Sequence, residues 1–200
     1  MARGFRGELP GKERSRICRK ALDYIRANPM SQPSRGATQP MTLETPCPER
    51  ATPGGAAPAV VLDTNAVLDW LVFRDPSCAG WTDRFADGRV RWIASTAMRV
   101  ELAHVLARPA LAPWRPEPQA VWAAWERWAR MLEPVAPAGP AARLRCTDPD
   151  DQKFVDLALA RGARWLVSRD RAVLKLGRRT RSLGLQVLTP GSWAAALPAG

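Results

Sequence analysis

The sequence predicts one α/β domain, in which a mainly parallel sheet of four to five strands lies between two layers of helices. Two observations predict it. From about residue 57 to the end of the chain, short apolar runs alternate with amphipathic segments, the pattern of strand–helix–strand units. That part also holds about 145 residues, enough to bury roughly 68% of the surface that an unfolded chain exposes. A single core therefore suffices for all the predicted elements.

Residues 1–56 have a different composition, and we expect them to form a mobile extension outside the folded domain, residues 57–200. They carry ten Lys and Arg against five Asp and Glu, and from Asn28 onward they are dense in Pro, Ser, Thr and Gly. Such a segment buries too little apolar surface to offset the entropy that is lost on ordering. Only residues 16–26 have the apolar spacing of a short helix.

The first predicted strand is a continuous apolar run that ends in a carboxylate, which is typical of a strand buried on both faces. Later in this half, Ser95 or Thr96 supplies the N-cap of a helix that Pro109 stops. The predicted elements up to that proline are a strand over 58–63, helices over 65–73 and 81–86, a strand over 90–94 and a helix over 96–108.

Helical periodicity continues in the second half of the chain. Val121, Trp125, Trp128 and Leu132 share one stripe, so core or dimer packing is favoured over base stacking for these tryptophans. Acidic residues open the next helix, where they suit the positive end of its dipole, and Gly162 ends it. The predicted elements here are helices over 119–132 and 150–161, a strand over 164–168, a short helix from about residue 171 and a strand over 185–188.

Composition excludes several classes of protein. No apolar run approaches the ~20 residues that cross a bilayer, and no apolar stretch follows the basic N-terminus, so neither a membrane span nor a secretory signal is predicted. The four cysteines are scattered without a C-x-x-C pair, which argues against a zinc ribbon or a disulfide scaffold. The single histidine, His104, excludes a site built on two imidazoles, and we expect it to be structural. A reducing, cytoplasmic setting fits best.

Charge favours a polyanionic partner such as nucleic acid. Thirty Lys and Arg against nineteen Asp and Glu give a net charge of +11. Eight of the basic residues lie within residues 161–181, where Asp170 is the only acid. The alternative is that these arginines form a solvated surface and reflect a composition bias of the whole chain.

Acidic residues recur where predicted strands end and where helices begin. In an open α/β sheet the ligand crevice lies outside the carboxyl ends of the strands, so these side chains are expected at one site. Each alone has a plainer role, as a helix cap or as part of a solvated helix face. The candidates, in chain order, are Asp63, Glu101, Asp148, Asp150, Asp151 and Asp170.

Carboxylates gathered in one crevice repel one another unless a cation neutralises them. Mg²⁺ or Mn²⁺ can do so, because hard divalent ions prefer oxygen ligands. Such an ion lowers the pKa of a bound water and takes up charge at a phosphodiester, so hydrolysis of a nucleic acid needs neither histidine nor cysteine. The residues therefore predict a metal-dependent phosphodiester hydrolase.

Four segments that cover about two-thirds of the chain resemble the PIN-domain family. These segments are VVLDTNAVLDWLV, STAMRVELAHVLARP, DPDDQKFVDLALARGARWLVSRDRAVL and LQVLTP. The family comprises metal-dependent ribonucleases and includes toxins of many bacterial toxin–antitoxin pairs, the branch that this sequence resembles most. The resemblance implies the same α/β fold and the same activity.

The resemblance also implies a set of site residues. The family's acidic quartet, which binds Mg²⁺ or Mn²⁺ and carries catalysis, falls on Asp63, Glu101, Asp151 and Asp170. Asp151 is preferred because the residues that follow it keep the family's spacing, and Asp148 and Asp150 remain as substitutes or outer ligands. Asn65 and Ser168 match polar positions that orient ligands or metal-bound water in the family.

Arg169 departs from the family, in which small residues are common before the fourth acid. We expect its side chain either to pair with Asp170 and weaken metal binding or to hold a phosphate. Arg169, Arg171 and Lys175 are therefore the candidate substrate-binding residues of a basic rim around the acidic site.

The leading hypothesis is a single-strand endoribonuclease that acts as the toxin of a type II toxin–antitoxin pair. Its expected partners are RNA, a small antitoxin whose tail occludes the acidic groove, and a second copy of the chain in a homodimer. One alternative, prompted by Arg169 and the basic extension, is a PIN-fold RNA-binding or scaffold protein with little hydrolytic activity. Another is a housekeeping RNA-maturation nuclease without an antitoxin.

Overall fold

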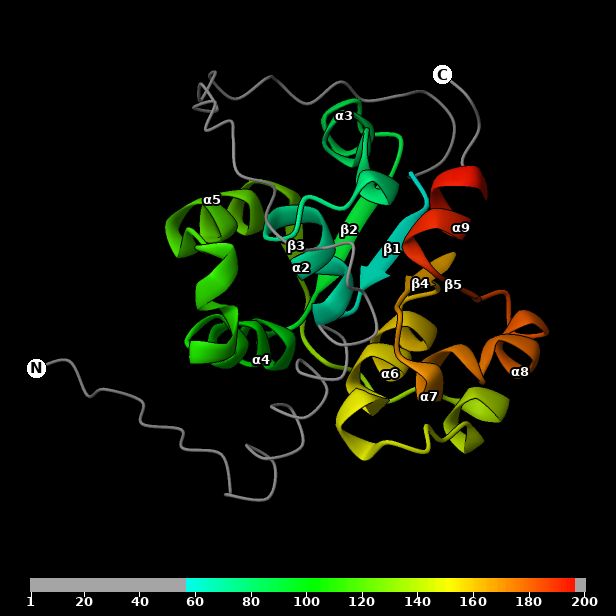
Figure 1. Cartoon of the computed structure of the whole chain (residues 1–200). Helices are drawn as coiled ribbons and strands as arrows, with labels where there is room; N and C mark the ends of the chain where they lie inside the picture. Colours follow the sequence, from blue (N-terminus) through cyan, green and yellow to red (C-terminus); the bar gives the residue numbers. More distant parts are fainter. Residues whose placement is uncertain (1–56, 197–200) are drawn as a thin grey trace, which may run out of the picture.

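A computed structural model describes residues 57–196, and a five-stranded sheet forms the centre of this part (Figure 1). The strand order is β3-β2-β1-β4-β5, and every neighbouring pair is parallel. The strands are β1 (Ala59–Leu62), β2 (Arg91–Ala94), β3 (Ala129–Met131), β4 (Trp165–Val167) and β5 (Gln186–Leu188). The predicted parallel α/β sheet is thus confirmed, with all five strands.

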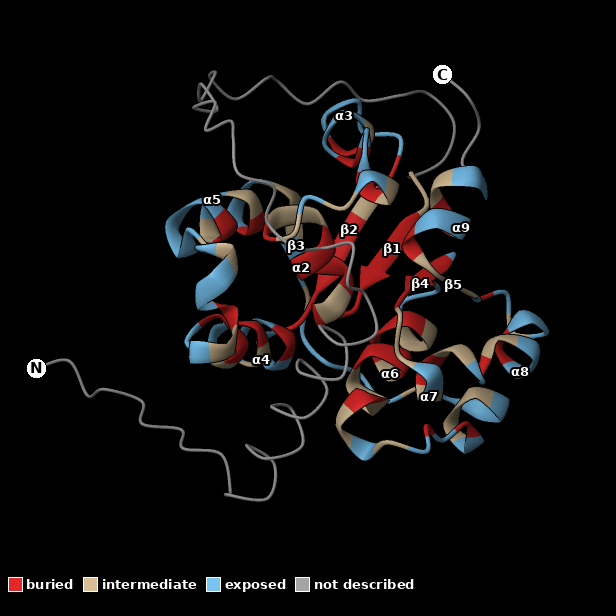
Figure 2. Ribbon diagram, in the orientation of Figure 1, coloured by how far each residue is buried: buried red, intermediate tan, exposed pale blue. Residues whose placement is uncertain are grey.

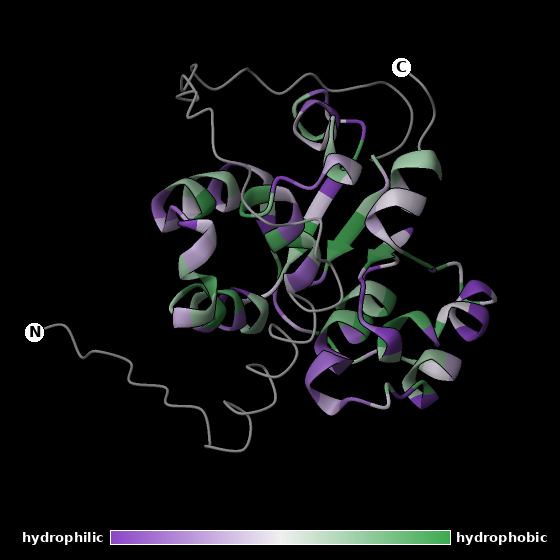
Figure 3. Ribbon diagram, in the orientation of Figure 1, coloured by the Kyte–Doolittle hydropathy of each residue, from purple (hydrophilic) through white to green (hydrophobic). Residues whose placement is uncertain are grey.

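The central strand, β1, is apolar throughout because it is covered on both faces. All four of its residues are buried, and Val60 pairs with Trp92 on one side and with Trp165 on the other. Figure 2 shows this strand in the buried colour, and Figure 3 shows it among the most hydrophobic segments of the chain. A strand in this position has no solvated face, which explains the continuous apolar run in its sequence.

Helices cover both faces of the sheet, which makes the three predicted layers. Among the described residues they are α2 (Thr64–Leu71), α3 (Trp81–Ala86), α4 (Thr96–Leu106), α5 (Pro118–Trp128), α6 (Gln152–Ala160), α7 (Arg171–Leu174), α8 (Gly177–Arg181) and α9 (Pro190–Ala196). Figure 1 shows α4 and α5 on one side of the sheet and α6, α7 and α8 on the other. Short 3-10 helices connect them: η2 (Pro76–Cys78), η3 (Pro109–Trp114), η4 (Gly139–Arg143) and η5 (Pro149–Asp151).

The strand order reverses its direction between β1 and β4. The chain moves outward from β1 to β2 and β3, returns beside β1 as β4, and then moves outward in the opposite direction to β5. Because parallel crossovers are right-handed, the two directions put their helices on opposite faces. The reversal point lies between β1 and β4, and ligands of such sheets bind outside the carboxyl ends of the strands there.

Tryptophans link the helical layers to the sheet. Trp81 of α3 meets Trp193 of α9 edge to face at 4.8 Å between ring centroids, and Trp92 of β2 meets Trp125 of α5 at 4.7 Å. All four are buried, and each such pair adds about 0.5–1.5 kcal/mol beyond its area burial. The expectation that Trp125 packs in the core is confirmed.

One predicted helix was too long at its C-terminal end. The apolar stripe indicated a helix over 119–132, but α5 ends at Trp128 and Ala129–Met131 form the edge strand β3. Pairing with β2 explains the difference, because these residues align with Trp92–Ala94 and the Leu132 amide donates to the Ala94 carbonyl at 2.8 Å. An open sheet edge overrides local helical periodicity here.

Several expectations lie outside the described residues: the mobile extension over 1–56, its helix over 16–26, and the end of the domain at 197–200. Within residues 57–196, no helix has both the length and the apolar character needed to span a membrane.

Candidate active site

Two of the predicted acids follow the strands that flank the reversal point. Asp63 comes directly after β1, and Asp170 comes three residues after β4 ends at Val167. Leu62 is in register with Val167, and the Asp63 amide donates to the Val167 carbonyl at 2.9 Å. The sheet therefore fixes the backbone at the first acid against the strand that leads to the other.

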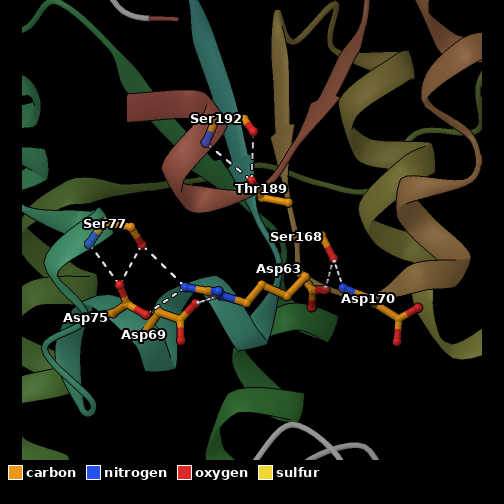
Figure 4. Close-up of polar contacts among 9 residues, drawn as sticks. Asp63, Asp69, Asp75, Ser77, Ser168, Asp170, Thr189 and Ser192 are labelled. Carbon is orange, nitrogen blue, oxygen red and sulfur yellow. Dashed lines mark hydrogen bonds and ion pairs between the residues drawn. The ribbon is translucent and has the colours of Figure 1, made fainter. Parts of the chain in front are cut away.

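Ser168 connects these two acids directly (Figure 4). It is completely buried, and its Oγ donates to Asp63 Oδ2 at 2.6 Å while accepting from the Asp170 amide at 2.9 Å. Asp63 is itself only 2% exposed. A hydroxyl that donates to a buried carboxylate stabilises its charged form and fixes its orientation. The structure thus places Ser168 beside the acids that it was expected to orient.

Asp170, Asp63 and Asn65 lie at the starts of helices. Asp170 is the N-cap of α7, and its Oδ1 accepts from the Ala172 amide at 2.6 Å. Asp63 occupies the N-cap position of α2 without a side-chain capping bond, so the plain capping role weighed for this residue does not apply. Asn65 is half-buried in the first turn of the same helix.

The other two predicted acids lie on α4 and at the start of α6. Asp151 is buried, at 4% exposure, and ends η5 where α6 begins. Glu101 of α4 forms an ion pair with Lys153 of α6, with 2.5 Å between Oε2 and Nζ. The Lys153 ammonium also donates to the Asp150 carbonyl. This pair joins α4, which carries Glu101, to α6, which begins directly after Asp151.

Asp148 and Asp150, the alternatives to Asp151, differ in their surroundings. Asp148 caps η5 by accepting from the Asp150 amide at 3.0 Å, which matches the cap expected in this group. Asp150 Oδ2 is buried and has no hydrogen-bond partner among residues 57–196. A buried carboxylate oxygen in that state is costly, so it is a candidate to receive a cation.

The candidate acids have the ligand chemistry that a hard divalent cation prefers, but their arrangement fits such an ion only in part. All candidate ligands are carboxylates, the class that Mg²⁺ and Mn²⁺ prefer. In the part of the chain that the structure describes, however, no three Asp, Glu, His or Cys side chains are grouped closely enough to hold a metal ion. Glu101 is the clearest departure, since the Lys153 ammonium already neutralises it.

Arg169 forms ion pairs with two acids that are distant from it in sequence. Its Nε contacts Asp69 Oδ2 at 2.5 Å, and its Nη2 contacts Asp75 Oδ2 at 2.7 Å and Ser77 Oγ at 3.3 Å. The sequence left two roles open for this guanidinium, pairing with Asp170 or binding a phosphate, and the structure adds its contacts with Asp69 and Asp75. Neither Asp69 nor Asp75 was a candidate from the sequence, although the Asp-Pro-Ser turn that holds Asp75 is visible there.

The other two predicted substrate-binding residues are exposed beside the acidic edge. Arg171 and Lys175 belong to α7 and the turn that follows it. Over residues 57–160, thirteen Asp and Glu outnumber twelve Lys and Arg, whereas residues 161–181 carry eight Lys and Arg and one Asp. The positive charge of the folded part is therefore concentrated next to the site rather than spread by a general bias. Figure 3 shows α8 as strongly hydrophilic.

Other ionisable groups do not contribute to a nucleophilic site. Burial raises the pKa of the Cys78 thiol to about 12, so it stays protonated at neutral pH. His104 is half-buried on α4, and its Nδ1 has no hydrogen-bond partner among the described residues.

Fold and site together define a doubly wound α/β domain with an acidic edge at its reversal point. The family model described as PIN domain matches residues 59–172, more than half of the chain. The chain therefore belongs to the PIN-domain family, whose members are generally nucleases, which hydrolyse phosphodiester bonds. A search of curated proteins gives no match.

Proposed function

We propose that this protein is a divalent-metal-dependent endoribonuclease that cleaves single-stranded RNA at the carboxyl end of the sheet, with Asp63, Glu101, Asp151 and Asp170 as its acidic residues. The observation that carries the proposal is the buried Asp63–Ser168–Asp170 connection at the reversal point of the sheet. A buried carboxylate held by a hydroxyl, as Asp63 is, is expensive in a purely structural role, and it is expected where a cation is bound.

In this proposal the chain's own residues position the reaction. Asp63, Asp151 and Asp170 would hold Mg²⁺ or Mn²⁺, with Asp150 as an outer ligand. When bound, such an ion supplies Lewis-acid stabilisation of the charge that develops on the phosphate. Ser168 keeps the Asp63 carboxylate oriented throughout.

Exposed cations next to the acids support a polynucleotide as the substrate. Within the described residues, Arg171, Lys175, Arg178, Arg179 and Arg181 have no ion pair and are all exposed. Such cations bind phosphates irrespective of sequence, with an affinity that falls steeply with salt. Phosphates flanking the scissile bond would lie across α7 and α8.

The cellular role that we propose is the toxin of a type II toxin–antitoxin pair in the cytoplasm. A small antitoxin would occlude the acidic edge, and a homodimer would be the assembled form. Support for this role is the resemblance of the sequence to the toxin branch of the family.

Cleavage of a mixed single-stranded RNA pool tests the proposal. Purified protein is incubated with Mn²⁺, with Mg²⁺ or with chelator, beside duplex RNA and single-stranded DNA of matched length. We expect fragments only from single-stranded RNA and only with metal. Cleavage in chelator would contradict the metal requirement, and equal cleavage of DNA would contradict the substrate class.

A second candidate is an RNA-binding or scaffold protein without hydrolytic activity, and the Lys153–Glu101 ion pair favours it. An ammonium that neutralises an acidic ligand leaves less charge to attract a metal. Thermal unfolding separates the two, because Mn²⁺ stabilises a metal-binding protein by an amount that grows with the logarithm of its concentration over Kd, and it does not stabilise the scaffold.

A further inference from the structure

The Arg169 guanidinium bridges two carboxylates, those of Asp69 in α2 and Asp75 before η2. We call this arrangement the fork. Arg169 lies in the loop between β4 and α7, between Ser168 and Asp170 in sequence, and it contacts Asp69, Asp75 and Ser77 of the segment from α2 to η2. Its side chain is 24% exposed, whereas that of Asp69 is fully buried. The pair is therefore shielded from the solvent screening that weakens surface ion pairs such as Arg99–Glu126.

The two carboxylates are themselves fixed. Asp75 Oδ1 accepts from the Ser77 amide at 2.8 Å and from the Ser77 hydroxyl at 2.7 Å. The Asp75 amide in turn donates to the Asp69 carbonyl at 2.9 Å, after a left-handed turn at Arg74, where φ is 52°. The two carboxylates that Arg169 contacts are thus held in place by the α2–η2 segment itself.

Burial raises the pKa of Asp69 to about 7 against the lowering effect of the Arg169 guanidinium. The bonds of Ser77 and the charge of Arg169 outweigh burial at Asp75 and lower its pKa. The guanidinium therefore contacts two carboxylates whose environments shift their pKa values in opposite directions.

Helix α2 and the β4–α7 loop meet at two points. Asp63 at the start of α2 contacts Ser168, and Asp69 six residues later contacts Arg169. Backbone bonds of Asp63 to Val167 and of Ser168 to Leu188 hold the start of the loop, and the Arg169 contact attaches it to α2 at a second point beyond them. Both contacts are drawn in Figure 4, where Asp69 and Asp75 lie on one side and Asp63, Ser168 and Asp170 on the other.

We propose that Arg169 is a positioning residue of the nuclease site, whose ion pairs with Asp69 and Asp75 lock the β4–α7 loop onto α2 and so hold Ser168 and Asp170 in register with Asp63. This inference rests on the proposed function for its catalytic consequence, but not for its structural one. Its role is distinct from phosphate binding, because the fork is directed to carboxylates of the same chain.

The test uses the full-length protein and two independent readouts. The first is hydrogen exchange by NMR at the Asp170 and Ala172 amides, whose acceptors are Ser168 Oγ and Asp170 Oδ1. The second is kcat and KM on single-stranded RNA with Mn²⁺. The variants are Arg169→Lys and the neutral pair Arg169→Met with Asp69→Asn, which leaves neither of these two positions charged, while Asp75 keeps its bonds from Ser77. The matched control is Arg89→Gln, which removes an exposed ion pair with Asp87 at 3.6 Å.

In the neutral-pair variant we expect faster exchange at both amides and a kcat lowered by roughly 10- to 100-fold, with KM within about threefold of wild type. Arg169→Lys keeps the charge but loses the fork, so it should restore part of kcat. Arg89→Gln should behave as wild type in both readouts.

Three results are decisive. Unchanged exchange and unchanged kcat in a folded neutral-pair variant would overturn the positioning role. A raised KM with unchanged kcat would overturn it in favour of substrate binding by Arg169. If wild-type protein cleaves no RNA but exchange still increases in the variant, the lock is supported and the proposed nuclease function fails instead.

Discussion

Replacing Ser168 with alanine removes the hydroxyl that connects Asp63 to Asp170. The bond to a charged carboxylate at 2.6 Å is worth about 2 kcal/mol, and the Asp170 amide loses its acceptor at a further cost of about 1 kcal/mol. Because Ser168 is completely buried, solvent cannot replace these contacts fully. We expect the free energy of unfolding to fall by about 3 kcal/mol.

For a folded part of this size, about 3 °C of Tm accompanies each kcal/mol, so Ser168→Ala should lower Tm by about 10 °C. Thermal unfolding in chelator measures this directly. The control is Ser182→Ala, since Ser182 Oγ donates to the Arg179 carbonyl in an exposed position and its loss should cost at most about 0.5 kcal/mol. A second comparison uses Asp63→Asn, in whose background Ser168→Ala should cost less because the pair is coupled.

A Tm for Ser168→Ala within about 2 °C of wild type would refute this reasoning, given the scale of 3 °C per kcal/mol. Full additivity of Ser168→Ala and Asp63→Asn would refute it as well, because independent effects are expected only of residues that do not interact.

Two further predictions concern ionisable groups near the site. The pKa of Asp69 is raised to about 7, so the folded state keeps a proton between about pH 4 and 7 that the unfolded state has lost. Its contribution to stability is therefore full below pH 4 and declines as pH rises to 7, by at most about 4 kcal/mol. Asp69→Asn should flatten this decline in Tm measured against pH, and parallel curves for variant and wild type would contradict it. Lys153→Met removes the ammonium that competes with a metal ion for Glu101, so it should tighten Mn²⁺ binding by roughly tenfold. The Mn²⁺-induced shift in Tm measures this binding, and Lys153→Arg is the control that keeps the charge. Unchanged or weaker binding in Lys153→Met would show that the ion pair does not oppose the metal.

The central sheet could be predicted from the sequence because its inner strands carry their own signal. β1 and β4 are continuous apolar runs since both of their faces are buried. The edge strand β3 could not be predicted in the same way. Its three residues, Ala129–Met131, become a strand only because β2 offers them an unpaired edge, and nothing local distinguishes them from the end of a helix.

The site, too, has residues that could be predicted from the sequence and residues that could not. Asp63 and Asp170 could be placed beside each other because strand order in a parallel sheet sets which carboxyl ends meet. The Arg169 network could not, since its partners Asp69 and Asp75 lie 100 and 94 residues away in sequence and the choice among them is made by side-chain rotamers. The ion pair of Glu101 with Lys153 was missed for the same reason.

The most direct test of the central claim is the cleavage rate of two matched variants, Asp63→Asn and Asp83→Asn. Both remove one carboxylate charge, but Asp63 is buried at the proposed site whereas Asp83 is exposed on α3. With single-stranded RNA and saturating Mn²⁺, the account predicts a loss of at least about 100-fold in kcat for Asp63→Asn and a wild-type rate for Asp83→Asn. A folded Asp63→Asn protein that cleaves as fast as Asp83→Asn would place the chemistry elsewhere and contradict the account.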